Sequence, residues 1–389
     1  MRTAAVVGTG LIGTSVALAL THSGVSVHLL DADESAARTA ASLGAGTVGT
    51  PPAPADIAVL AVPPGSIAEE LAKQQSNGLA RSYTDVASVK AGPERGAVDR
   101  ADFTCYIGGH PMAGRETSGP LSACSTLFEG RSWVLTPTPD TAIDTLNRAL
   151  EVVALCRAVP VVMESGTHDR AVALVSHTPH VVASLMAARL ENMPEEAAQL
   201  VGQGLRDVTR VAGSDPRLWV DILDANASAV ASILQELTTD LSGVVAGLRS
   251  LASDSADERA QGMTLVTDLL SRGRKGHERV PGKHGKKPFP CIPVHVLIGD
   301  QAGELARLVS TVAELGVNIE EMTIDHSPGE ATGLVALMVE AASAAQLARR
   351  LGDGGWTVQR TPPRPDVPAP AAPAVGSPPR AVPWAADTA

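Results

Sequence analysis

Apolar and polar positions change their spacing twice along this chain. In the first part, short apolar runs alternate with segments of helical spacing: a run at 3–7 predicts a buried strand, and the spacing over 11–22 predicts a helix. Further strands are expected at 25–30, 57–62, 83–86, 103–107 and 133–136. Because strands that alternate with helices usually pair in parallel, the first part is expected to be an α/β domain.

The strand pattern stops near Ser165. From there to Leu270 the apolar positions follow helical spacing, most clearly over 171–190 and 218–251. This region is expected to be a separate all-helical domain.

The α/β pattern returns in the last part of the chain. A basic, glycine-rich stretch at 272–287 is typical of a solvated linker, although it could also contact a phosphate or an acidic partner surface. Residues 292–358 then show a strand, a GDQAG turn, a helix, two strands and a second helix, which is most of a βαββαβ unit. From Thr361 the chain is rich in Pro and Ala and is expected to be disordered.

Charge and cysteine usage narrow the class of protein. A formal net charge of −11 over 389 residues argues against a general nucleic-acid binder, whose phosphate contacts need clustered Lys and Arg. None of the four cysteines lies in a CxxC pair, so we expect free thiols in a reducing cytoplasm. The N-terminus lacks a signal-peptide pattern, and no stretch of about 18 uninterrupted apolar residues predicts a membrane span.

A glycine-rich turn, GTGLIG at 8–13, follows the first strand and opens the first helix. In such a turn the first glycine permits a tight bend, the second lets the backbone approach a pyrophosphate, and the third lets the helix pack closely on the strand. The helix N-terminus then offers amide donors to the phosphates. The residues expected to bind a dinucleotide here are Gly8, Gly10, Leu11, Ile12 and Gly13.

An acidic residue, Asp31, ends the second predicted strand. A carboxylate at this position can accept hydrogen bonds from both ribose hydroxyls and would repel a 2′-phosphate. No Arg follows it directly, and Arg38 is the nearest. We therefore predict NAD rather than NADP as the cofactor, with Asp33 as the cap of the next helix.

Oxidation of an alcohol by hydride transfer needs a base for the hydroxyl proton. His110, in GGHPMAG just after a predicted strand, is the candidate, because histidine titrates near neutrality and strand ends of α/β sheets hold ligands. Ser88, in TDVASVK, also follows a strand end and could bridge this base and a substrate oxygen. Taken singly, His110 fits a structural turn residue equally well, and Ser88 fits a helix cap.

The helical region adds polar candidates. His168 and Asp169 are adjacent, and His177 and His180 would share one helix face if the proline between them permits. The histidine pair lacks a convincing third ligand, so no metal site is predicted. Arg210, in TRVAGSDPRLW, could hold a carboxylate through two hydrogen bonds, although a surface arginine would look the same.

Five of these segments together resemble the prephenate/arogenate dehydrogenase family of tyrosine biosynthesis. They occur in the family's order and spacing over about residues 1–280: GTGLIG, TDVASVK, GGHPMAG, HDRAVALVSHTPH and TRVAGSDPRLWVDI. The resemblance implies an α/β Rossmann domain followed by an all-α helical dimerisation domain, in a homodimer. It implies NAD-dependent oxidative decarboxylation of prephenate to 4-hydroxyphenylpyruvate.

The resemblance also implies roles for single residues. His110 would accept the ring hydroxyl proton as hydride leaves the same carbon, and Ser88 would position His110 and that hydroxyl. Arg210 matches an arginine that binds a substrate carboxylate. His180 matches a histidine that lines the substrate pocket, and Trp219 matches a nearby tryptophan that in the family can come from the partner subunit.

Two further histidines match motif positions. His177 is counted among the expected substrate-binding residues, and His168 has no assigned role. This sequence departs from the family pattern at Ala87, where a glycine often precedes the serine, and at Thr178, where an apolar residue is common. Neither departure changes a group assigned to the chemistry.

The C-terminal unit, with GDQAGELARLVSTVAELGVNIEEM, resembles an ACT domain, an α+β fold of the ferredoxin-like type. In ACT domains the glycine-containing turn before the first helix often lies at an amino-acid effector site. Feedback inhibition by tyrosine is therefore one hypothesis, and a domain that only aids assembly is the other. The expected parts are an NAD-binding Rossmann domain (1–163), a helical substrate and dimerisation domain (164–275), a basic linker (276–290), an ACT-like regulatory domain (291–360) and a disordered tail (361–389).

Other readings of the same pattern are weaker. β-Hydroxyacid dehydrogenases combine the same two domains but need a catalytic lysine in the helical region, and no lysine occurs between Lys90 and Lys275. A non-catalytic NAD sensor would have little use for a base, a serine and a carboxylate-binding arginine together.

Prephenate and arogenate differ in one keto or amino group. No acid adjoins His180, which favours prephenate, with arogenate dehydrogenase or a dual cyclohexadienyl dehydrogenase as the alternative.

Overall fold

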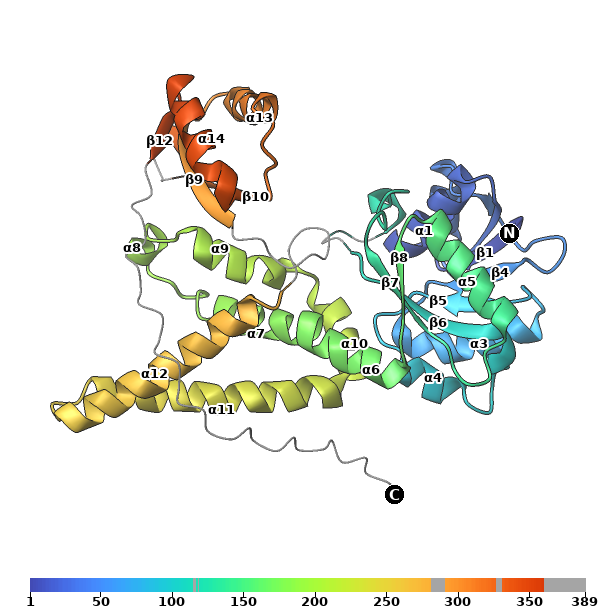
Figure 1. The fold of residues 1–389 in the computed structure, drawn as a ribbon. Helices are drawn as coiled ribbons and strands as arrows, with labels where there is room; N and C mark the ends of the chain where they lie inside the picture. The colour runs from blue at the N-terminus through green and yellow to red at the C-terminus, as the bar shows by residue number, and fades with distance from the viewer. Residues whose placement is uncertain (115–116, 118, 281–290, 327–330, 360–389) are drawn as a thin grey trace, which may run out of the picture. The chain divides into compact units, whose positions relative to one another are not determined.

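The computed structural model describes the chain except for residues 115–116, 118, 281–290, 327–330 and 360–389 (Figure 1). The tail and most of the basic linker therefore lie outside the described residues. The chain divides into two compact units, Met1–Gly273 and Arg274–Ala389, and each is described by itself.

An eight-stranded sheet forms the centre of the first part of unit Met1–Gly273, in the order β3-β2-β1-β4-β5-β6-β7-β8. The strands are β1 (Thr3–Val7), β2 (Ser26–Leu30), β3 (Thr47–Val48), β4 (Ile57–Leu60), β5 (Tyr83–Asp85), β6 (Tyr106–Pro111), β7 (Ser132–Thr136) and β8 (Val159–Val162). All pairs are parallel except β6 with β7. The chain leaves β1 first toward β2 and later toward β4, so a topological switch point lies between β1 and β4, where open α/β sheets bind ligands.

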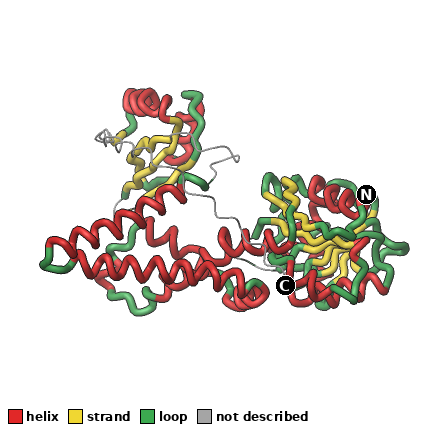
Figure 2. The backbone as a smooth tube through the Cα atoms, turned by 60° about the horizontal axis from the view of Figure 1, so that its bottom comes forward, coloured by secondary structure: helices red, strands yellow, loops and turns green. Residues whose placement is uncertain are grey.

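Helices cover both faces of this sheet, as Figure 2 shows. They are α1 (Leu11–His22), α2 (Glu34–Ser42), α3 (Ile67–Ser76), α4 (Ala91–Ala97) and α5 (Ile143–Leu155). Apolar side chains of α1, α2 and α5 join one core, and those of α3 and α4 join the other. Strands β1 and β4 are buried on both faces, which explains their unbroken apolar sequence. The expected Rossmann-type α/β domain is confirmed.

One strand boundary differs from the prediction in a way that affects the site. The strand expected at 103–107 begins only at Tyr106, because Phe103–Cys105 forms a 3-10 turn. Asp102 caps this turn by accepting a hydrogen bond from the amide of Thr104 at 2.8 Å. His110 consequently lies inside β6, next to its end, and not in the loop after a strand.

The second part of the same unit is helical. Its elements are α6 (Ser165–Val172), a π-helical turn (Ala173–His177), α7 (Thr178–Ala188), α8 (Glu195–Ala198), α9 (Gln203–Thr209), a 3-10 turn (Arg210–Gly213), α10 (Pro216–Ala225), α11 (Ala227–Leu251) and α12 (Ala256–His277). The all-helical character expected after Ser165 is confirmed. The linker expected from Arg272 was wrong for its first residues, because α12 continues to His277.

The helical spacing predicted over 218–251 is confirmed, and it is divided between α10 and α11 by a break at Asn226. The backbone of Asn226 leaves the helical region (φ −126°, ψ 25°). Its buried side chain instead donates to the carbonyl of Asp169 at 2.8 Å. The amide also lies 3.1 Å from Nδ1 of His177. These side-chain contacts compensate for the helix hydrogen bonds lost at the break. The spacing of apolar residues in the sequence does not reveal them.

One helical stretch within the described residues, Ser165–Ala188, is long and apolar enough to cross a membrane by length and composition alone. Its His168, Asp169 and His177 side chains are buried and hydrogen-bonded to neighbouring segments. A helix in a protein core meets the same test, and the hydrogen bonds of these buried polar groups join the stretch to neighbouring segments of the same unit.

The C-terminal unit carries a four-stranded antiparallel sheet in the order β10-β11-β9-β12. Its elements are β9 (Cys291–Gly299), α13 (Glu304–Glu314), β10 (Glu321–His326), β11 (Thr332–Glu340), α14 (Ala341–Asp353) and β12 (Thr357–Gln359), a βαββαβ order. β10 starts at Glu321, after a turn in which the amide of Val317 bonds back to the carbonyl of Val312 near the end of α13.

Candidate active site

The glycine turn between β1 and α1 is shaped by backbone contacts. Gly8 has φ +97°, and a Cβ there would lie 2.3 Å from the carbonyl oxygen of Ala61. A Cβ on Gly13 would lie 1.9 Å from the carbonyl oxygen of Gly8, so only glycine lets α1 approach the strand this closely. Gly10 has nothing within 4 Å of its Cβ position, which leaves room for a ligand. Leu11 and Ile12 begin α1, and no side chain caps this end of the helix.

Asp31 follows β2 and is aimed at the glycine turn. One carboxylate oxygen accepts from the amide and the hydroxyl of Thr9, at 2.6 and 2.7 Å. The other oxygen accepts from the amide of Asp33 at 2.9 Å. Asp33 itself accepts from the amide of Ser35 and caps α2, as predicted. The Asp31 carboxylate therefore has a fixed position beside the turn expected to hold the pyrophosphate.

His110 is the first member of a chain of three polar side chains. Its Nδ1 lies 2.8 Å from Nε2 of His168, and Nδ1 of His168 lies 2.8 Å from Oδ1 of Asp169. Burial lowers the pKa of His110 well below the usual value, and the neighbouring His168, Lys90 and His177 lower it further. His110 is thus neutral at physiological pH, as a proton acceptor must be.

Beneath His110 lies a buried ion pair that the sequence reasoning missed. Lys90 is almost completely buried and its ammonium group pairs with Asp85, the last residue of β5. It also donates to the carbonyl of Gly109 at 2.6 Å. Tyr106 donates to the other oxygen of Asp85 at 2.6 Å. These bonds tie β5, the loop after it and β6 together directly before His110.

Ser88 lies in the loop between Asp85 and Lys90 and is half-buried. In the described part of the chain it makes no hydrogen bond to His110. The loop is held at its far end, where the amides of Lys90 and Ala91 donate to Asp169 at 2.8 and 2.9 Å.

His177, His180 and Trp219 form an aromatic cluster in the helical region. Trp219 of α10 stacks on His180 of the same chain, with ring centroids 3.5 Å apart and planes at 7°, and meets His177 edge-on at 6.2 Å. Burial lowers the pKa of His177 to about 4 and also lowers that of His180. The π-helical turn Ala173–His177 precedes Pro179, which lacks an amide hydrogen; such turns often occur at functional sites.

Arg210 is exposed and opens the 3-10 turn Arg210–Gly213. This turn packs against α7, the helix that carries His180.

Two groups of predicted site residues are therefore assembled around different elements. His110 belongs with His168 and Asp169, whereas Trp219 belongs with His180 and His177. Among the described residues, no group of three or more His, Cys, Asp or Glu side chains is arranged to hold a metal ion.

Two family models match consecutive parts of this chain. Residues 16–162 match the nucleotide-binding domain of prephenate dehydrogenase, and residues 164–263 match its dimerization domain. The first match begins inside α1, so the glycine turn itself lies just before it.

Individual relatives agree with the family models. NovF of Streptomyces niveus, described as a probable prephenate dehydrogenase, is 39% identical over 360 residues, which cover 92% of this chain and 99% of NovF. The prephenate dehydrogenase of A. aeolicus, solved with hydroxyphenyl propionate and NAD+, is 28% identical, with a TM-score of 0.62 over 72% of this chain and 98% of its own. The arogenate dehydrogenase of Synechocystis is also 28% identical, with a TM-score of 0.58 over 71% of this chain and 100% of its own. This chain therefore belongs to the prephenate dehydrogenase family of NAD-dependent oxidoreductases.

Proposed function

We propose that this enzyme oxidises prephenate with NAD+ to 4-hydroxyphenylpyruvate, CO2 and NADH. The observation that carries the proposal is a buried, neutral His110 at the end of β6, in the domain that also presents the glycine turn and Asp31. When bound, NAD+ supplies the hydride acceptor. His110 takes the proton of the ring hydroxyl as hydride leaves that carbon. The ring carboxylate then leaves as CO2, and the electron pair of the broken C–C bond moves through the ring to the oxygen. This oxygen can take the proton back from His110.

The other site residues receive roles around this step. We assign Ser88 to orienting the ring hydroxyl, and Arg210 to binding a substrate carboxylate through its guanidinium group. His180, stacked on Trp219, forms a wall of the substrate site, and His177 supports that wall from the π-helical turn. Gly8, Gly10, Leu11, Ile12 and Gly13 are assigned to the pyrophosphate, and Asp31 to the ribose.

The substrate is tested by following NADH absorbance with prephenate and with arogenate in parallel. We expect a higher kcat/KM for prephenate. A higher value for arogenate would support the alternative that the likeness to the Synechocystis enzyme raises, a dehydrogenase that forms tyrosine directly. No NADH with either substrate would contradict the proposed function.

The base is tested by His110→Asn. The amide cannot take the proton, so kcat should fall by about 10³-fold or more, whereas the Kd for NADH should stay the same because the glycine turn is untouched. Turnover near that of the wild type would remove the assignment.

We also propose that the enzyme is a homodimer in the cytoplasm. Support comes from the dimerization-domain match and from a row of exposed apolar side chains on α11: Leu237, Leu241, Val245 and Leu248. None of the four cysteines, all of which are described, forms a disulfide, which suits a reducing compartment.

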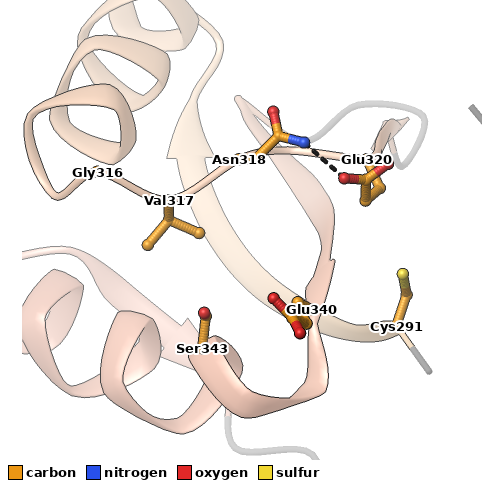
Figure 3. Close-up of a pocket in the computed structure, with 7 residues that line it drawn as sticks. All are labelled: Cys291, Gly316, Val317, Asn318, Glu320, Glu340 and Ser343. Carbon is orange, nitrogen blue, oxygen red and sulfur yellow. Dashed lines mark hydrogen bonds between the residues drawn. The ribbon is translucent and has the colours of Figure 1, made fainter. Parts of the chain in front are cut away.

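We further propose that the C-terminal unit is an ACT-type regulatory domain that responds to tyrosine. Its βαββαβ order and antiparallel sheet support this, as does the turn before α13, where Gly303 has φ +96°. Figure 3 shows a pocket at the other end of α13, in which Asn318 bonds to Glu320 opposite Glu340 and Ser343. Isothermal titration with tyrosine tests the proposal, and absence of binding by any aromatic amino acid would count against regulation.

A further inference from the structure

The Asp169 carboxylate is surrounded by donors. It accepts from the amides of Lys90 and Ala91 and from Nδ1 of His168, at 2.8, 2.9 and 2.8 Å. Burial alone would raise its pKa, but the hydrogen bonds from His168 and the two amides outweigh burial and lower it. Asp169 is therefore an ionised group that can only accept hydrogen bonds.

This acceptor sets the direction of the hydrogen bonds that follow. Because Asp169 can only accept, a neutral His168 ring carries its proton on Nδ1 and presents a lone pair on Nε2. That lone pair faces Nδ1 of His110 at 2.8 Å, so the proton of the neutral His110 ring lies on Nδ1. The lone pair of His110 is then on Nε2, the nitrogen that is left free to act as a base.

We propose that His168 and Asp169 are positioning residues that hold His110 in the tautomer with a free Nε2. This inference rests on the oxidation of prephenate or arogenate proposed above. When Nε2 of His110 takes the hydroxyl proton, the ring becomes positive, and its Nδ1–H bond to His168 connects that charge to the Asp169 carboxylate. No proton has to pass from His110 to His168 or Asp169, because the proton on Nε2 can return to the phenolate oxygen.

The same carboxylate also connects two parts of the site. Asp169 belongs to α6 of the helical region, whereas the amides of Lys90 and Ala91 begin α4 of the sheet domain. The loop with Ser88 ends at these amides. A role in fastening the two parts together is therefore the competing explanation, and the experiment must separate it from control of the tautomer.

Asp169→Asn reverses the hydrogen bond to His168. The new side chain keeps its size and one oxygen, which can still accept from the amide of Ala91. Its NH2 group, in place of the oxygen that bonds to both His168 and the amide of Lys90, would donate to Nδ1 of His168 and give up the bond from Lys90. Both imidazole tautomers would then reverse, and Nε2 of His110 would carry a hydrogen. We expect kcat to fall by up to about 10⁴-fold, the loss found when a carboxylate that orients a catalytic histidine is replaced by an amide, with KM and the Kd for NADH within about 3-fold of wild type.

A pair of substitutions at His168 gives a second measurement if Asp169→Asn does not fold. His168→Gln retains an oxygen that can accept from His110, whereas His168→Leu retains none. The glutamine variant should keep at least about 10-fold more kcat than the leucine variant. Arg170→Gln, an exposed change on the same helix, is the control and should match the wild type.

Tautomers can also be read without turnover, from the ¹⁵N shifts of the His110 ring, assigned by their loss in His110→Asn. Hydrogen on Nδ1 in the wild type and on Nε2 in Asp169→Asn would support the inference. Hydrogen on Nε2 in the wild type would overturn it, as would wild-type kcat in both Asp169→Asn and His168→Leu. Failure of the proposed function would show differently, as a wild-type enzyme that forms no NADH from either substrate.

Discussion

His110 has a low pKa because of its surroundings. Burial removes the water that would stabilise an imidazolium, and the Lys90 ammonium is an unfavourable neighbour for a second positive charge. A protonated His110 cannot accept the substrate proton, so activity should be lost only when the pH falls below this lowered pKa. The profile of kcat against pH should therefore stay level from pH 8 to below 6.5, the ordinary histidine value. An acidic limb centred at 6.5 or above would contradict the described surroundings.

Asp31 is the residue on which the choice of cofactor depends. Asp31→Ser removes a fixed carboxylate beside the glycine turn, so the KM for NAD should rise by about 10-fold or more, since hydrogen bonds to a charged group contribute about 1.5–3 kcal/mol. The same change removes the repulsion of a 2′-phosphate, so kcat/KM for NADP should rise relative to that for NAD. Steady-state kinetics with both cofactors measures this, and an unchanged ratio would show that Asp31 does not face the ribose.

The residues of the site differ in how far the sequence could predict them. The glycine turn and Asp31 lie in one local segment, where spacing alone carries information. The contact of His110 with His168 joins residues 58 positions apart, and nothing in either segment shows which ring nitrogen faces which. Lys90 looks like any surface lysine in the sequence. Its burial depends on Asp85 and on the carbonyl of Gly109, which only the folded sheet brings to it.

Among the elements, the strand–turn–helix of β1 and α1 allows a matched pair of substitutions. Gly13→Ala would place a methyl group 1.9 Å from the Gly8 carbonyl oxygen and should destabilise the protein by about 1–3 kcal/mol. Gly10→Ala meets no protein atom within 4 Å and should leave stability unchanged, yet weaken NADH binding where the pyrophosphate approaches. Thermal unfolding and NADH titration of both variants test this. Equal loss of stability in the two would refute the described packing.

The π-helical turn contributes a pH-dependent stability. The pKa of His177 is about 4 in the folded chain, below its ordinary value near 6.5. As the pH falls from 6.5 toward 4, the unfolded chain binds a proton that the folded chain does not, so the free energy of unfolding decreases by up to about 3 kcal/mol. His177→Gln should lose less stability over this window than the wild type does. Urea unfolding at pH 7 and pH 4.5 measures the difference, and identical losses would contradict it.

Element boundaries could be predicted where the cause is local. The helix at Leu11–His22 follows from the glycine turn before it and from its own apolar spacing. The break at Asn226 could not be predicted, because the apolar spacing continues across it. Its cause is the pair of contacts that the Asn226 side chain makes with Asp169 and His177, which lie 57 and 49 residues earlier in the chain.

At the scale of the whole molecule, the apolar row on α11 should govern assembly. Leu241 and Leu248 expose 64% and 53% of their surface and recur on one face of the helix. Leu241→Glu combined with Leu248→Glu should convert a dimer into monomers, because buried unpaired charges are costly at an interface. Sedimentation velocity measures the mass. Thr239→Glu, which adds charge to the opposite face of α11, is the control, and a dimer in all three proteins would exclude this face.

The burial of Lys90 also provides a chemical reporter. The first 273 residues contain two lysines, Lys73 and Lys90, and Lys73 is exposed. An acylating reagent should modify Lys73 quickly and Lys90 only when β5, its loop and β6 separate. Mass spectrometry of the peptides that contain Lys73 and Lys90 would thus measure the rate at which the site opens in an otherwise folded enzyme. It would also show whether a bound dinucleotide lowers that rate.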